Sequence, residues 1–183
     1  MLSAVVALPP LIFVIWIGPP LYFSILVSVA AGRGAWEFFR IARVPGKPVA
    51  WIMGSVLAAG ITFGGHLEPY LLPYLVLWTT LLLFFSSALW LPANTWPGPR
   101  GLAGGVIGTL FVGATLGSLT LLRNFGGESE GWQWTFYLLL VIWGSDTGAY
   151  YVGRSFGKHP LSPRLSPNKT IEGAIAGLAT GVV

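Results

Sequence analysis

Apolar residues fall in long runs along this chain, and short polar segments separate the runs. Charged residues are absent from positions 1–32, 48–65, 69–99, 101–122 and 131–145. Because a helix of ~20 apolar residues crosses a hydrocarbon core of ~30 Å, runs of this size are typical of membrane spans. The runs are apolar on every face instead of alternating, which favours helices over barrel strands. The pattern therefore predicts an all-α fold, a polytopic bundle of transmembrane helices.

Prolines, glycines and charged loops divide these runs into individual spans. Gly18-Pro19-Pro20, for example, separates the first two. Six complete spans are predicted at 2–17, 21–38, 49–63, 70–91, 102–122 and 132–152, and a seventh starts near Pro167. We interpret 1–183 as a single membrane-embedded domain, with transmembrane helices over 1–143, a cytoplasm-facing motif region over 144–173 and the start of the next helix over 174–183.

Composition and charge agree with this topology. Charged residues make up 9% of the chain, whereas a soluble domain carries about 25%. Basic residues prevail in every second loop, at 33–47, at 100 and at 154–169. By the positive-inside rule, the N-terminus and the region 144–172 then face the cytoplasm. The net charge of +4 reflects these loops, and no basic surface interleaved with aromatic residues suggests a nucleic-acid partner.

Glycines recur at short intervals in the fifth and seventh spans. Small residues four positions apart allow helix backbones to approach closely. This spacing predicts helix packing and no ligand role for Gly101, Gly104, Gly105, Gly108, Gly113 and Gly117, and for Gly173, Gly177 and Gly181.

The concentrated polar chemistry lies at 144–173 and opens with Asp146, an acid inside an apolar run. A carboxylate at such depth is costly, so it normally faces a polar cavity and marks a functional site. The structural alternative is a carboxylate near the helix end that pairs with Arg154 or Lys158.

Further on, Ser166-Pro167 resembles an N-cap followed by proline at the first helical position. Free N–H groups at a helix start attract phosphate, and Lys169 and Thr170 in the first turn would add a cation and a hydroxyl. Glu172 would hold a metal ion or orient Lys169. A well-capped helix with an acid near its N-terminus remains the alternative. His66 and His159 have no second ligand at metal-binding spacing.

The order Asp146-Thr-Gly-Ala-Tyr, Gly157-Lys and Ser166-Pro-Asn-Lys-Thr-Ile-Glu-Gly resembles the phosphatidate cytidylyltransferases (CDP-diacylglycerol synthases). The resemblance covers essentially the whole chain, and its diagnostic part is the last forty residues. It implies a membrane enzyme of phospholipid biosynthesis that converts CTP and phosphatidic acid to CDP-diacylglycerol and pyrophosphate with Mg²⁺. It further implies location in a bacterial inner membrane, among membrane lipids, and a possible homodimer.

The resemblance also implies roles for individual residues, carried over position by position. The catalytic candidates are Asp146, Lys169 and Glu172. The substrate-binding candidates are Arg154, Lys158, Ser166, Asn168 and Thr170. Asp146 is also a candidate metal ligand, with the principal magnesium carboxylates expected beyond Val183.

Family members continue past this segment to an acid-rich signature, whereas this chain stops at Val183. We therefore expect an incomplete chain that is inactive by itself. Two hypotheses from other classes remain open. One is a non-catalytic membrane protein whose cytoplasmic basic loop binds anionic lipid. The other is a transporter, which is disfavoured because no inverted repeat is present and Asp146 is the one ionisable group expected inside a span.

Overall fold

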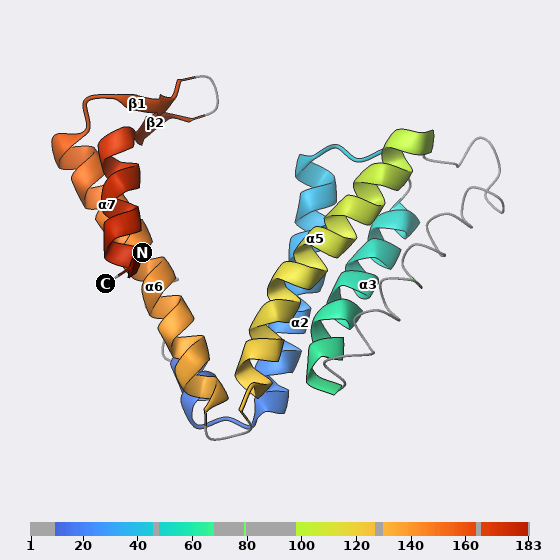
Figure 1. Ribbon diagram of the computed structural model, residues 1–183. Helices are drawn as coiled ribbons and strands as arrows, with labels where there is room; N and C mark the ends of the chain where they lie inside the picture. Colours follow the sequence, from blue (N-terminus) through green and yellow to red (C-terminus); the bar gives the residue numbers. More distant parts are fainter. Residues whose placement is uncertain are drawn as a thin grey trace. The chain divides into compact units, whose positions relative to one another are not determined.

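The computed structural model describes residues 10–45, 48–67, 79, 98–126, 130–163 and 166–182. These residues belong to two compact units, Met1–Trp132 and Gln133–Val183. Residues 10–16 are helical. The further elements, labelled in Figure 1, are α2 (Pro20–Ile41), α3 (Pro48–Leu67), α5 (Gly98–Asn124), α6 (Gly131–Phe156), β1 (Pro160–Ser162), β2 (Ser166–Thr170) and α7 (Ile171–Val182). Apart from one hairpin, the described chain is helical, which confirms the all-α prediction.

In the first unit, α2, α3 and α5 lie side by side (Figure 1) around a small core of aromatic and aliphatic side chains. Phe39 of α2 is almost completely buried there, and its ring lies against Gly54 of α3 and Gly108 of α5. A Cβ atom at Gly108 would collide with the rings of Phe38 and Phe39, so the helices approach too closely for a side chain. The glycines of α5 therefore serve helix packing, as the sequence predicted.

Hydroxyl groups join α3 to α5 across this glycine-rich contact. Thr62 donates a hydrogen bond to the Gly113 carbonyl at 3.2 Å, and Thr120 donates one to the Thr62 carbonyl at 2.8 Å. Both threonines are completely buried. Each hydroxyl also lies within hydrogen-bond distance of a carbonyl in its own helix, that of Ala58 for Thr62 at 3.0 Å and that of Gly117 for Thr120 at 2.7 Å, so its single proton is shared between the two helices.

Two of the described helices, α3 and α5, are long and apolar enough to cross a membrane, and α7 is an apolar helix of shorter length. The predicted spans at 21–38, 49–63, 102–122 and 132–152 all coincide with observed helices. The predicted fourth span, 70–91, lies outside the described residues except for Thr79, as does the first half of the predicted first span.

In the second unit, α6 and α7 pack through a row of small residues with a spacing of four. Gly173 of α7 lies against Gly153 and the Ala149 carbonyl of α6, and Gly177 lies against Ser145. This contact confirms the predicted packing role of the seventh-span glycines. The β1–β2 hairpin connects the end of α6 to the start of α7, as Figure 1 shows.

The last helix begins four residues later than predicted. Residues 166–170 do not form a first helical turn with Ser166 as N-cap, because they pair as strand β2 with β1. The helix starts at Ile171, so Lys169 and Thr170 precede it. Pro167 suited both readings, since proline is favoured at the first helical position and is also tolerated in an edge strand.

Candidate functional site

The hairpin at the end of α6 carries four of the eight predicted site residues. Its strands are antiparallel, pairing Pro160 with Thr170 and Ser162 with Ser166, and an irregularity lies between the two pairs. Asn168 and Lys169 are exposed on β2, whereas Ser166 is half-buried. Lys158, just before β1, is also exposed. With Lys158, five predicted site residues therefore lie on or beside the hairpin, within residues 158–170.

Thr170 is the residue that caps α7. Its hydroxyl oxygen accepts a hydrogen bond from the Gly173 N–H at 3.2 Å, the bond that an N-cap side chain makes to the third helical residue. The same hydroxyl lies against Gly153 and Gly157 at the end of α6. The predicted substrate-binding hydroxyl thus joins the hairpin to both helices.

Glu172 lies in the first turn of α7 and is bound by His159. The carboxylate Oε1 is 2.7 Å from the His159 ring Nδ1, and Oε2 accepts a hydrogen bond from the His159 backbone N–H at 3.3 Å. The Ile171 N–H in turn donates to the His159 carbonyl at 2.9 Å. The Glu172 side chain is 26% exposed and that of His159 is 74% exposed. The first amides of α7 thus already have partners within the protein, which argues against a phosphate seated on free N–H groups there.

These contacts lower the pKa of Glu172 from 4.5 to about 2. The hydrogen bond from the His159 side chain is the largest cause, followed by the backbone N–H of Glu172; burial opposes them, and the backbone N–H groups of Lys158 and His159 lower the pKa further. A carboxyl group whose pKa is lower in the folded protein stabilises it above the unfolded pKa, near 4.5, and loses that contribution as the pH falls toward 2.

We expect His159→Ala to raise the pKa of the Glu172 carboxyl toward 4.5, because the largest stabilising hydrogen bond is removed. Carbon-13 NMR of a sample labelled at glutamate side chains measures this titration directly. The parent protein, labelled and titrated in the same way, serves as the reference. An unchanged Glu172 titration in the variant would contradict the assigned contact.

The other two candidates, Arg154 and Asp146, lie on α6, before the hairpin. Arg154 donates a hydrogen bond to the Tyr150 hydroxyl at 2.7 Å, and its guanidinium lies 5.9 Å from the centre of that ring. Asp146 is exposed and lies two turns earlier, about 12 Å from Arg154 along the axis. Within the described residues no hydrogen bond or ion pair is found for Asp146, so the pairing with Arg154 or Lys158 considered as an alternative is not observed.

The described carboxylates do not by themselves make a magnesium site. No group of three or more histidine or acidic residues that could hold a metal ion occurs in the part of the chain that the structure describes. Both oxygens of Glu172 already contact His159. Asp146 is therefore the remaining candidate ligand of the motif region, and a magnesium ion bound here would need oxygen ligands from elsewhere.

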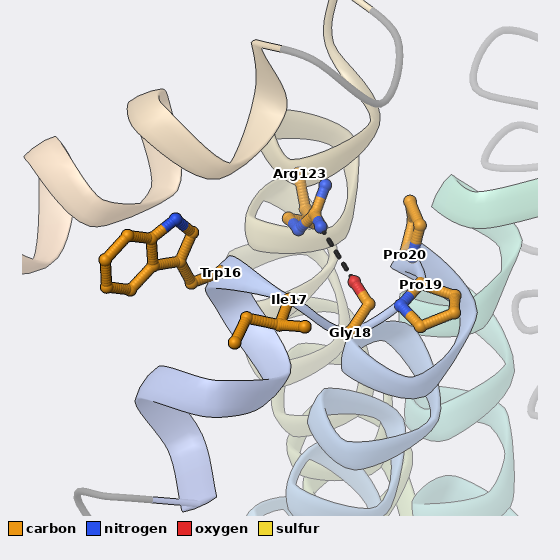
Figure 2. Close-up of a pocket in the computed structure, with 6 residues that line it drawn as sticks. All are labelled: Trp16, Ile17, Gly18, Pro19, Pro20 and Arg123. Atoms are coloured by element: carbon orange, nitrogen blue, oxygen red, sulfur yellow. Dashed lines mark hydrogen bonds between the residues drawn. The ribbon is translucent and has the colours of Figure 1, made fainter.

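A second polar feature lies within the three-helix unit itself. Arg123, in the last turn of α5, is 2% exposed and donates a hydrogen bond to the Gly18 carbonyl at 3.0 Å. Figure 2 shows this bond crossing to the break that separates the first helix from α2. A cavity of about 190 Å³ adjoins the contact and is lined by Trp16, Ile17, Gly18, Pro19, Pro20 and Arg123. Pro19 provides no side-chain cap for α2, and Arg123 adds a side-chain hydrogen bond at this break to the backbone bonds donated by Gly18 and Tyr22.

Replacing Arg123 with alanine should lower the free energy of unfolding by about 1.5–2 kcal/mol, since a hydrogen bond from a charged group to a buried carbonyl is lost. Denaturant unfolding of the purified protein in detergent measures this change. Arg100→Ala removes an exposed cation from the first turn of α5 and is the matched control, expected within about 0.5 kcal/mol of the parent. Equal effects of the two changes would show that the Gly18 contact is not stabilising.

Sequence reasoning missed His159 and Tyr150. His159 appeared isolated because thirteen residues separate it from Glu172, and only the hairpin brings the two together. Recognising 160–170 as a hairpin would have revealed the pair, since closing the strands places position 159 opposite 171. Tyr150 was detectable from its spacing alone, because residues four apart on a helix are neighbours.

Taken together, the site and the helices define a class: an apolar helical protein whose α6–α7 pair holds an exposed, lysine-bearing hairpin suited to anionic ligands. Comparison with known proteins specifies the family. The sequence model of the cytidylyltransferase family matches residues 1–183, and the chain belongs to this family.

Curated relatives agree with the family assignment. A phosphatidate cytidylyltransferase of Haemophilus influenzae is 29% identical over all of this chain and 69% of its own length. One of Pseudomonas aeruginosa is 30% identical over 86% of this chain and 58% of its own length. One of Staphylococcus haemolyticus is 49% identical over 32% of this chain and 23% of its own length. The chain thus spans a quarter to about two thirds of these relatives. No solved structure matches it.

Proposed function

We propose that the full-length protein is a phosphatidate cytidylyltransferase, which transfers CMP from CTP to phosphatidic acid and yields CDP-diacylglycerol and pyrophosphate. Membership of the cytidylyltransferase family supports this proposal, as do the names of the Haemophilus and Pseudomonas relatives. Because this chain spans 69% and 58% of those two proteins, the activity is proposed for the complete protein.

One observation on the site carries the proposal. Lys158 and Lys169 each lie within two residues of the hydrogen bond between the Ile171 N–H and the His159 carbonyl. Both lysines are exposed, so their ammonium groups can meet ligands from water. Two cations beside the hydrogen-bonded base of the hairpin are suited to neutralising phosphate oxygens. Positioning and electrostatic stabilisation, to which fixed cations contribute, provide most of the catalysis in phosphoryl-type transfers.

The reaction requires few other catalytic groups from the protein. A phosphate oxygen of phosphatidic acid forms a bond to the α-phosphorus of CTP, and the bond from that phosphorus to the pyrophosphate oxygen breaks. The attacking oxygen is already anionic, so a strong general base is not required. Lys169 and Lys158 would stabilise the developing charge, Arg154 would contact a more distant phosphate, and Ser166, Asn168 and Thr170 would supply neutral hydrogen-bonding groups.

Magnesium belongs to the proposal as the expected cofactor of such a reaction. When bound, a divalent cation would neutralise phosphate charge and align the attacking and leaving oxygens. Asp146 is the candidate ligand in this chain. Since the described acids do not complete a magnesium site, no step of the reaction is derived from it.

We further propose that the protein is a polytopic protein and a homodimer of a bacterial inner membrane, with its N-terminus and hairpin on the cytoplasmic side. The two apolar helices α3 and α5 support a membrane location. The positive-inside pattern gains support from the three-helix unit. Val44 follows Arg43 in the sequence, and it contacts Gly104, which lies four residues after Arg100. The basic segments around Arg43 and Arg100 therefore lie at the same end of this unit. The cytoplasmic hairpin would then meet soluble CTP and a membrane lipid together.

The direct test is an assay of the purified full-length protein in lipid nanodiscs containing phosphatidic acid. We expect CTP-dependent formation of CDP-diacylglycerol with equimolar pyrophosphate, abolished by chelation of magnesium, and no comparable product from ATP. A folded protein without turnover that binds phosphatidic acid vesicles would instead support the alternative, a non-catalytic membrane protein whose basic hairpin binds anionic lipid.

A further inference from the structure

His159 uses three of its groups to bind the start of α7. Its ring Nδ1 and its backbone N–H both contact the Glu172 carboxylate, at 2.7 and 3.3 Å. Its carbonyl accepts the Ile171 N–H at 2.9 Å. One residue at the entry of the hairpin thus makes side-chain and backbone bonds to two consecutive residues at its exit, which closes the hairpin at its base.

The same contacts fix the backbone on one side of Lys169. Thr170, the next residue, is held through its hydroxyl by the Gly173 N–H, and it packs against Gly153 and Gly157. The Lys169 side chain itself is exposed and has no hydrogen bond or ion pair within the described residues. Its attachment point is therefore fixed while its ammonium group remains available, which is what a charge-stabilising cation needs.

We propose that His159 is a positioning residue that acts through Glu172 to hold Lys169 in place for phosphate transfer. Glu172 accordingly belongs to the closure of the hairpin, since both of its oxygens are used there, and its contribution to the reaction is indirect. The kinetic part of this inference depends on the proposed function, whereas the structural part, the closure of the hairpin, does not.

The variants that test it follow from the geometry of the histidine ring. Asparagine places its side-chain amide nitrogen near the position of Nδ1, so His159→Asn keeps a donor for the Glu172 carboxylate, whereas His159→Ala removes it. In the full-length protein we expect His159→Ala to lower kcat ~10–100-fold, because misplacing a reacting group by about 1 Å costs up to ~100-fold. The KM for CTP should change much less, and His159→Asn should regain most of kcat.

A double-mutant cycle separates indirect from direct action. If His159 acts through Glu172, then His159→Ala combined with Glu172→Ala should be no slower than Glu172→Ala alone, within about twofold. Glu130→Gln, which changes an exposed acid just before the start of α6, is the matched control and should leave kcat unchanged. Additive losses in the double variant, or an asparagine variant as slow as alanine, would overturn the inference by indicating that the imidazole meets the substrate itself.

Hydrogen–deuterium exchange gives a second readout that requires no turnover. His159→Ala should accelerate exchange of the Ile171 amide, whose hydrogen bond closes the hairpin, and of the Gly173 amide, whose hydrogen bond caps α7, and His159→Asn should do so much less. Unchanged exchange in the alanine variant would overturn the closure. If the wild-type protein shows no cytidylyl transfer, the proposed function fails, and this exchange experiment still decides whether His159 closes the hairpin.

Discussion

Replacing Lys169 with alanine in the full-length protein should lower the rate of CDP-diacylglycerol formation by about 10²–10³-fold and leave folding intact. We expect a change of this size because Lys169 would supply one fixed positive charge that stabilises the developing charge on the phosphate. Removing one such group from other enzymes lowers the rate by a factor of this order. Folding should survive because the Lys169 side chain is exposed and makes no hydrogen bond or ion pair in the described part of the chain. Initial rates at saturating CTP, together with thermal unfolding, measure the two effects.

An exposed cation in the other compact unit provides the control. Arg40, in the last turn of α2, is exposed, and Arg40→Ala should keep turnover close to that of the parent. If Lys169 only attracted anionic lipid, its removal would weaken lipid binding by about 1 kcal/mol and leave the rate at saturating substrate unchanged. That outcome would remove Lys169 from the catalytic candidates and favour the lipid-binding alternative.

Gly173→Val should disrupt the packing of α6 against α7 and with it the site. A Cβ atom at Gly173 would lie 2.8 Å from the Ala149 carbonyl oxygen and 3.0 Å from the Gly153 Cα, and neither backbone atom can move independently of its helix. Overpacking of this kind costs up to about 3 kcal/mol. Because the Gly173 N–H also bonds the Thr170 hydroxyl, separating the helices would displace the residue next to Lys169. We therefore expect a lower unfolding temperature and a large loss of turnover.

Gly60→Val is the matched control, since nothing lies within 4 Å of a Cβ atom at Gly60 in α3. Both substitutions replace a helical glycine by valine, so their intrinsic helix propensities change equally. The Gly60 variant should unfold at nearly the parental temperature and remain active. Similar losses in the two variants would mean that valine is harmful in these helices generally, and the close approach of α6 and α7 would not be the cause.

The helices of this protein could be predicted from the sequence because the signal is local. Charge-free runs led to the helices at 21–38, 49–63, 102–122 and 132–152, and the observed helices α2, α3, α5 and α6 lie over them. The glycine spacing likewise indicated where backbones meet, and Gly108 and Gly173 do lie at helix contacts. Both inferences depend on residue size and polarity, which are properties of each position.

The hairpin could not be recognised in the same way. Residues 166–170 contain a proline and polar residues that fit a helix start as well as an edge strand, and their pairing with residues 160–162 depends on how two segments fit each other. Local preference placed the helix start near Pro167, whereas the strand pairing moved it to Ile171. The N-cap residue is therefore Thr170 and not Ser166 as predicted. Lys169 lies in a strand and not in the first helical turn.

The sequence by itself determined that this is an apolar helical protein and that its polar chemistry lies between Asp146 and Glu172, because composition and charge are independent of the fold. Only the tertiary structure decided which of those residues meet. It joined His159 to Glu172 and Thr170 to Gly173, and it left Asp146 and Lys169 exposed without a partner among the described residues. The physical reason is that hydrogen bonds across a hairpin depend on how the chain closes, which no single position encodes.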